Sequence, residues 1–336
     1  MMQVLLQKIL VVGGNGFVGS AVCKAALARG MQVTSIRSSG TPYRTQKGHS
    51  PAWTSKVDWQ AGDALQPETY THLLPGVTAV VHTLGTLLED TRYKAALKEG
   101  DLPSLLKLVA LNAFGTGSAS NPLAEPAAKP GSYETLNRDA GTFWTALRVC
   151  EAFVTSQPTV SIEKPRPFVF VSAEDIFRPF IPARYIETKR EAEIEIGQMM
   201  TDKADYRAVY MRPSLIYHPH FRPLTSPVAA LLDLSATLHS KVPYGIPTPS
   251  GVLRTLASTM TSGQLYSSFV APSPLASVAN ALTIPPIHVD HVAEAICIAV
   301  DSERTDVRGV YGVREMRELI GWSQKGQQPS ELTVHA

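Results

Sequence analysis

Tyr185 and Lys189 stand four residues apart in the stretch Tyr185-Ile-Glu-Thr-Lys189. On a helix, residues at this spacing lie on one face. A lysine charge beside a phenol favours the tyrosinate form, which makes the phenol a usable proton donor or acceptor. The pattern by itself is common and mostly structural, so its meaning depends on what precedes it in the chain.

Three glycines near the start of the chain follow a short, largely apolar segment. Residues 8–12 predict a buried parallel strand, and residues 17–28 predict a helix with an apolar face. Between them, Gly13 allows a sharp turn, Gly16 a close approach to a pyrophosphate and Gly19 tight packing of helix on sheet. The helix N-terminus offers unpaired N–H groups to that phosphate. The pattern predicts a dinucleotide site formed by Gly13, Gly16, Phe17, Val18 and Gly19; the alternative is a glycine turn without a ligand.

The end of the predicted second strand, residues 31–37, indicates which dinucleotide is bound. A site for NAD usually places Asp or Glu here, to bond the ribose 2′-OH. This chain has Arg37-Ser38-Ser39, a cation and hydroxyl groups that suit a 2′-phosphate. We predict that Arg37 and Ser38 favour NADP(H), with NAD as the second cofactor; the alternative for Arg37 is a solvated surface residue.

Composition excludes several other classes of protein. The chain has 336 residues, 44% of them hydrophobic, and a formal net charge of +2, with no basic excess that nucleic-acid binding would need. Cys23, Cys150 and Cys297 are far apart, so we expect neither a disulfide framework nor a metal site. No Asp or Glu precedes Asp58, and this basic N-terminal stretch suits either organelle import or an electropositive cofactor site.

The order of the predicted elements points to one fold class. Strands are expected at residues 57–60, 78–82, 167–172 and 207–211, and helices at 67–74, 133–154, 185–200 and 292–300. Alternation of this kind predicts an α/β fold with a right-handed, doubly wound parallel sheet. Residues 86–132 interrupt it with a charged helical piece at 90–98 and a long glycine-rich connection, which is typical of a functional loop. Because the chain begins with this nucleotide-binding pattern, Lys189 can hold the nicotinamide ribose, and Tyr185 can exchange a proton next to the site of hydride transfer.

Changes in composition suggest four regions. We predict a Rossmann domain over residues 1–215, an apolar cap and substrate region over 216–286, a return to the core over 287–325 and a polar tail over 326–336. Between residues 224 and 287 only Asp233, Lys241 and Arg254 are charged. We therefore expect a mostly helical cap over the carboxyl edge of the sheet; the alternative is a poorly ordered insertion.

Taken together, these motifs resemble the extended and atypical short-chain dehydrogenases/reductases, the NAD-dependent epimerase/dehydratase-like branch. The resemblance covers residues 8–215 and implies that Gly13, Gly16 and Gly19 bind the cofactor phosphates, with Asp63 near the adenine. It also implies roles for the Leu84-Gly85 turn, for Asn137, and for Tyr185 and Lys189. Relatives commonly carry a Ser or Thr after the fifth strand that bonds the substrate carbonyl. Here the chain reads Val171-Ser172-Ala173, so Ser172 is the candidate, although that position could fall on Ala173.

Several phrases show a narrower resemblance, to a group of fungal mitochondrial NAD(P)-binding proteins associated with the ubiquinone-biosynthesis complex. That group is itself similar to an accessory subunit of respiratory complex I. The resemblance implies a place on the matrix side of the inner mitochondrial membrane, peripheral association with that membrane, and a partner in the ubiquinone-biosynthesis complex. The phrases are residues 81–89, 114–117, 121–123, 133–137 and 181–193.

Other polar residues receive simpler interpretations. His288 and His291 flank Asp290 without a third ligand at metal spacing, so we expect an aspartate cap at a helix start rather than a metal site. His218 and His220 are expected in a surface loop, with the mouth of a substrate site as the alternative. A solvated helix face is expected for Glu187, Arg190, Glu191 and Glu193.

Three functions are consistent with the sequence. The first is an NADP-preferring oxidoreductase acting on a hydrophobic, quinone-related substrate, with Tyr185 as acid/base, Lys189 as its electrostatic partner and Ser172 as carbonyl donor. The second is a cofactor-bound assembly or regulatory subunit without turnover. The third is a nucleotide-sugar epimerase or dehydratase, although Lys241 and Arg254 are the only basic residues that residues 224–287 offer to a sugar nucleotide.

Overall fold

The computed structural model describes residues 7–45, 47–85, 132–159, 164–176, 178, 181, 183–223, 225–243, 246–261 and 274–322. In this part of the chain a parallel sheet of seven strands has the order β3-β2-β1-β4-β5-β6-β9. Its doubly wound topology confirms the predicted fold class. The strands are β1 (Lys8–Val12), β2 (Gln32–Arg37), β3 (Val57–Ala61), β4 (Ala79–His82), β5 (Arg166–Val171), β6 (Tyr206–Met211) and β9 (Gly309–Tyr311).

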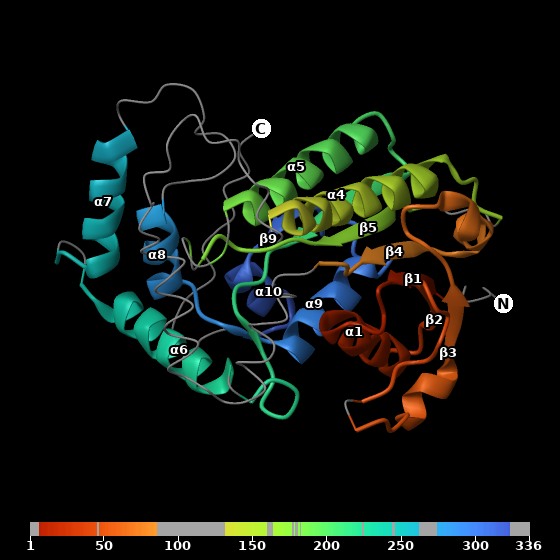
Figure 1. Cartoon of the computed structure of the whole chain (residues 1–336), viewed down its shortest axis with the longest axis horizontal. Helices are drawn as coiled ribbons and strands as arrows, with labels where there is room; N and C mark the ends of the chain where they lie inside the picture. Colours follow the sequence, from red (N-terminus) through yellow and green to blue (C-terminus); the bar gives the residue numbers. More distant parts are fainter. Residues whose placement is uncertain are drawn as a thin grey trace.

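Helices cover both faces of the sheet because alternate strand residues point to opposite sides. Ile9 and Val11 join one apolar core with α1 (Phe17–Ala28), α9 (Val289–Val300) and α10 (Val313–Leu319). Leu10 and Val12 join a second core with α4 (Ser132–Thr155) and α5 (Ala183–Met200). Figure 1 shows α4 and α5 side by side on one face, and α1 beside α9 on the other.

Some predicted elements differ from those observed. The helix expected at 67–74 is instead a pair of 3-10 turns, η2 (Pro67–Thr69) and η3 (Thr71–Gly76), and a third, η1 (Ala52–Lys56), precedes β3. Pro75 lacks the N–H that a continuing α-helix would need. The short β9 and α10 had no counterpart in the prediction. The piece at 90–98, most of the connection 86–132 and the tail 326–336 lie outside the described residues.

Three helices stand apart from the sheet at the left of Figure 1: α6 (Thr225–Lys241), α7 (Pro249–Thr261) and α8 (Pro274–Thr283). A small parallel pair, β7 (Ile216–Tyr217) and β8 (Ile287–His288), connects them to the core. The loop after β5 joins α8, since Arg178 N–H donates to Ser277 Oγ at 2.9 Å and Asn280 Nδ2 donates to the Asp175 carbonyl at 3.1 Å. Among the described helices, none is long and apolar enough to cross a membrane.

Arg166, the first residue of β5, connects several elements through its buried side chain. The side chain is 2% exposed, and its Nη2 donates to the carbonyls of Leu74 at 2.8 Å and Val77 at 2.7 Å. Its guanidinium carbon also lies 4.3 Å from the centroid of the Phe153 ring. Burial lowers the pKa of Arg166. These carbonyls and the ring provide the solvation that water would otherwise give.

We expect Arg166→Met to lower the free energy of unfolding by about 3 kcal/mol, because two buried carbonyls lose their donor. Urea denaturation would measure the loss. Arg148→Met is the matched control, since Arg148 is exposed on α4 and, among the described residues, forms its ion pair with Glu151. Equal stability of both variants would contradict a role for Arg166 in joining these elements.

Candidate functional site

The carboxyl ends of β1 and β4 meet where the strand order reverses, which is where α/β sheets bind ligands. Val12 of β1 pairs with His82 of β4. Beyond them Thr83 N–H donates to the Val12 carbonyl at 3.0 Å, and Thr83 Oγ1 donates to it at 2.8 Å. The glycine loop after β1 and the turn at residues 83–85 after β4 therefore lie side by side.

The glycine loop has the geometry that the sequence predicted. Gly13 has a φ of +90°, a left-handed conformation that favours glycine. A Cβ on Gly19 would lie 2.2 Å from the Gly13 carbonyl oxygen, so no larger residue fits there. Gly16 caps α1 without a side-chain hydrogen bond, which leaves the N–H groups of the first helical turn directed outward. Phe17 and Val18 are the first residues of that turn.

Gly85 brings the turn after β4 against Tyr185 and Lys189 of α5. A Cβ on Gly85 would lie 3.1 Å from Lys189 Nζ and 4.0 Å from the Tyr185 hydroxyl. Lys189 is 3% exposed and donates to the carbonyls of Val171 at 2.9 Å and Leu84 at 3.3 Å. The lysine ammonium and the tyrosine phenol are thus held at the open edge of the sheet, beside the glycine loop.

Ser172 follows β5 directly, and its hydroxyl bonds residues of α5 beyond Lys189. It donates to Glu193 Oε1 at 2.5 Å and accepts from Arg190 Nη1 at 3.2 Å. Arg212 at the end of β6 also donates to Glu193, from Nε at 3.0 Å and from Nη2. To reach a substrate, this hydroxyl would have to leave Glu193. The role of Ser172 as carbonyl donor stays a prediction.

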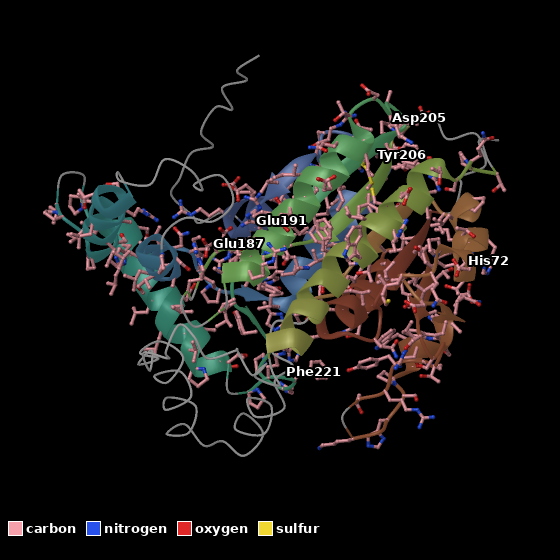
Figure 2. All side chains as sticks on the ribbon, turned by 45° about the horizontal axis from the view of Figure 1, so that its top comes forward. His72, Glu187, Glu191, Asp205, Tyr206 and Phe221 are labelled. Atoms are coloured by element: carbon pink, nitrogen blue, oxygen red, sulfur yellow. The ribbon has the colours of Figure 1, made fainter. Side chains whose placement is uncertain are left out.

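The expectation of a solvated helix face is wrong for Glu193 and Arg190 of α5. Glu193 is buried, because it lies one turn beyond Lys189 on the face that packs on the sheet, and Arg190 is mostly covered. The ion pairs and the hydrogen bond with Ser172 compensate for the loss of water around the carboxylate. Glu187 and Glu191 remain partly exposed along α5, as Figure 2 shows.

The loop after β2 forms a hollow of about 440 Å³ lined by Asn15, Arg37, Thr41, Pro42, Tyr43 and Arg44. Arg37 Nη1 donates to Thr41 Oγ1 at 3.1 Å. Two arginines thus line one hollow next to the glycine loop. Asn15, Tyr43 and Arg44 were missed by sequence reasoning, although Arg44 belongs to the stretch that has no acidic residue.

Three other predicted residues lie near this end of the sheet. Ser38 is exposed in the turn after β2. Asp63 follows β3, and its Oδ1 accepts the N–H of Leu65 at 3.0 Å, so it shapes its own turn. Asn137 falls in the first turns of α4, where only the backbone is described.

A histidine cluster lies at the junction of β7, β8 and α9. Potential metal-ligand atoms of His218, His288 and Asp290 lie within 4.8 Å of one another. The structure thus brings His218 to His288 and Asp290, which the spacing in the sequence did not indicate. His218 Nδ1 accepts the N–H of His220 at 3.1 Å, and His288 Nδ1 accepts the N–H of Asp290 at 3.2 Å. His288, rather than the expected aspartate, therefore caps α9. Because each Nδ1 lone pair is used in the backbone turn, the neutral rings carry N–H at Nε2 and we assign no metal to them.

His82 is a buried titratable group directly beneath the site, and sequence reasoning missed it. It is fully buried, and its Nε2 lies 3.3 Å from Thr145 Oγ1. Burial lowers the pKa of His82 to about 3, and the nearby Lys189 charge adds to this effect. His82 is therefore neutral in the folded protein at ordinary pH.

Comparison with known proteins identifies the family. The sequence model of the NAD dependent epimerase/dehydratase family matches residues 9–99. MIOREX complex component 2 of Saccharomyces cerevisiae is 33% identical over 216 residues, which are 64% of this chain and 75% of the yeast protein. The chain belongs to the NAD-dependent epimerase/dehydratase family.

Two further comparisons show a similar sequence and a similar fold. The 2-alkyl-3-oxoalkanoate reductase of Stenotrophomonas maltophilia is 26% identical over 213 residues, 63% of this chain and 52% of the reductase. A 3-oxoacyl-[acyl-carrier protein] reductase from Brucella melitensis, solved in complex with NAD, has a TM-score of 0.50 at 13% identity. That comparison covers 95% of this chain and 99% of the reductase, and it shows a shared fold.

We expect folding stability to decrease as the pH falls below 6.5, the ordinary pKa of histidine. Below this pH His82 binds a proton in the unfolded chain but stays neutral in the folded protein. His82 contributes a slope of up to about 1.4 kcal/mol per pH unit toward pH 4. His82→Gln should flatten this slope in denaturation series at different pH. The control is His72→Gln, an exposed residue labelled in Figure 2, which should keep the slope. Identical slopes for all three proteins would refute the effect of His82.

Proposed function

We propose that this protein is a nicotinamide-dinucleotide-dependent oxidoreductase that prefers NADP(H) and acts on a hydrophobic carbonyl or quinone-related substrate. The observation that carries the proposal is the meeting of Tyr185, Lys189 and Gly85 beside the glycine loop. A proton-transferring phenol and a buried cation then stand where a family member would hold the reactive end of its cofactor. Membership of the epimerase/dehydratase family supports the dinucleotide as cofactor.

Each part of the chain has a defined task in this proposal. Gly13, Gly16 and the N–H groups of Phe17, Val18 and Gly19 hold the pyrophosphate. When bound, the dinucleotide supplies or accepts a hydride at the substrate carbon. Tyr185 donates the proton that the substrate oxygen needs when the carbonyl is reduced, and takes it back in the reverse direction. Lys189 holds the ribose and stabilises the phenolate that remains.

The preference for NADP(H) rests on the hollow after β2. A 2′-phosphate there would meet the guanidinium groups of Arg37 and Arg44, with the hydroxyls of Ser38 and Thr41 as further donors. Guanidinium groups bind phosphate oxygens through paired hydrogen bonds. Among the described residues that line this hollow, none offers a carboxylate to the ribose diol of NAD. Asp63 remains a candidate contact for the adenine.

We expect Arg37→Ala to weaken NADPH binding by about ten- to a hundredfold and to change NADH binding little, because only NADPH carries the 2′-phosphate. Arg44→Ala should act in the same direction. Fluorescence titration with both reduced cofactors gives the ratio. Arg314→Ala, an exposed arginine on α10, is the control. Equal losses for NADH and NADPH would contradict the assignment.

The substrate class follows from the low charge of the region next to the site. Helices α6 to α8 carry few charges, and many of their leucines and valines are exposed. An apolar ring or acyl chain suits such surroundings better than a sugar nucleotide, which needs several basic contacts. A relative named as a reductase of 2-alkyl-3-oxoalkanoates supports a hydrophobic oxo substrate.

We expect Tyr185→Phe to abolish oxidation of NADPH by short-chain quinones while NADPH still binds, because only the phenolic oxygen is lost. Lys189→Met should weaken both binding and turnover. Slower turnover by Ser172→Ala would support the role of Ser172 as carbonyl donor. Unchanged turnover would indicate that Ser172 only bonds Glu193. Wild-type turnover by Tyr185→Phe would disprove the catalytic role.

A second candidate is a cofactor-bound subunit of a larger assembly, without turnover. A relative named as a component of the MIOREX complex favours it, as does the engagement of the Ser172 hydroxyl with Glu193. We propose the matrix side of the inner mitochondrial membrane for such an assembly, a location supported by the resemblance to mitochondrial proteins of ubiquinone biosynthesis. Tight NADPH binding without oxidation by any quinone tested would support this candidate. A third candidate, a nucleotide-sugar epimerase or dehydratase, keeps only the support of the family name.

A further inference from the structure

Arg222 reaches from the loop after β7 to the beginning of α1, more than two hundred residues earlier in the chain. Its guanidinium carbon lies 4.1 Å from the centroid of the Phe17 ring. Phe17 is the first residue of α1, the helix whose N-terminus follows the glycine loop. The contact therefore brings a cation from a distant loop to the place where the proposed pyrophosphate binds.

A tight turn fixes the backbone of Arg222. His218 Nδ1 accepts the N–H groups of His220 at 3.1 Å and Phe221 at 3.3 Å, and Arg222 N–H donates to the His218 carbonyl at 2.9 Å. The His218 ring also packs on Phe221, labelled in Figure 2, with ring centroids 4.4 Å apart. Pairing of β7 with β8 anchors the start of this loop next to α9.

The exposed side chain of Arg222 adds a positive charge to the N-terminal end of α1. A helix N-terminus carries a partial positive charge, so it repels a cation beside it and attracts an anion. Within the described ranges, no carboxylate lies within 4.0 Å of Arg222, and no acidic residue precedes Asp58 in the sequence. The Phe17 ring attracts the guanidinium and holds it beside the helix N-terminus. An anion between Arg222 and the helix N-terminus would satisfy both.

We propose that Arg222 binds the pyrophosphate of the dinucleotide at the N-terminal end of α1, next to the Phe17 ring. This inference rests on the proposed function and adds a residue from the region after β6 to the cofactor site. It assigns two tasks to different arginines: Arg37 and Arg44 read the 2′-phosphate, and Arg222 holds the pyrophosphate that NAD and NADP share. The planar fork of the guanidinium suits two phosphate oxygens, which an ammonium cannot contact in the same way.

The test compares three ligands on purified full-length protein: NADPH, NADH and 2′-AMP, which has no pyrophosphate. Arg222→Ala should weaken the binding of NADPH and NADH by the same factor, about ten- to a hundredfold. The affinity for 2′-AMP, measured by displacement of NADPH, should stay unchanged, because Arg37 and Arg44 bind its phosphate. Arg222→Lys should give an intermediate loss. Arg29→Ala is the matched control, because it removes the same charge at the other end of α1 and should leave all three affinities unchanged.

Each outcome separates this inference from the proposed function. Unchanged affinity of Arg222→Ala for both dinucleotides overturns the inference alone, and so does a loss confined to NADPH. An equal loss for 2′-AMP, or a lowered melting temperature of Arg222→Ala and Arg222→Lys, would assign Arg222 to loop structure instead. Failure of the wild-type protein to bind either dinucleotide overturns both proposals together.

Discussion

The close approach of α1 to the glycine loop sets the position of everything else in the site. Gly19 packs on the backbone of Gly13 so tightly that an added Cβ would overlap its carbonyl oxygen. This contact starts the helix immediately at the end of β1 and turns its N-terminal N–H groups toward the edge of the sheet. Small and apolar residues continue the contact along α1 and α9, where Cys23, Ala26 and Cys297 are buried. The cofactor end of the molecule therefore depends on a backbone contact rather than on any charged side chain.

Helix α5 provides the second half of the site by placing charged residues against the sheet. Lys189 bonds backbone carbonyls at the ends of β4 and β5, while Glu193, one turn later, bonds Ser172 and Arg212 at the ends of β5 and β6. A single helix face thus connects three neighbouring strands. Buried ions are costly, but here each has several partners, and the geometry that results is specific. The position of Tyr185 beside Gly85 follows from this arrangement.

The region after β6 is attached to the core at separate places by polar contacts. Asp175 and Arg178 form an ion pair in which both side chains are 5% exposed, and the same loop bonds α8. The histidine turn at 218–222 is attached near α9. The second attachment brings Arg222 to Phe17, at the end of the glycine loop. The exposed leucines of α6, by contrast, make this region apolar toward its surroundings.

The sheet, the glycine loop and the spacing of Tyr185 and Lys189 could all be predicted from the sequence, because each depends on local patterns. A buried strand, a glycine spacing and an i, i+4 pair are all readable within a few residues. The neighbours of each polar group, by contrast, could be identified only from the folded structure. The burial of Glu193 and His82, the hollow formed by Arg37 and Arg44, and the contact of Arg222 with Phe17 all join separate elements. Burial and electrostatics depend on what packs against a residue from elsewhere in the chain, and no pattern of neighbours in sequence contains that information.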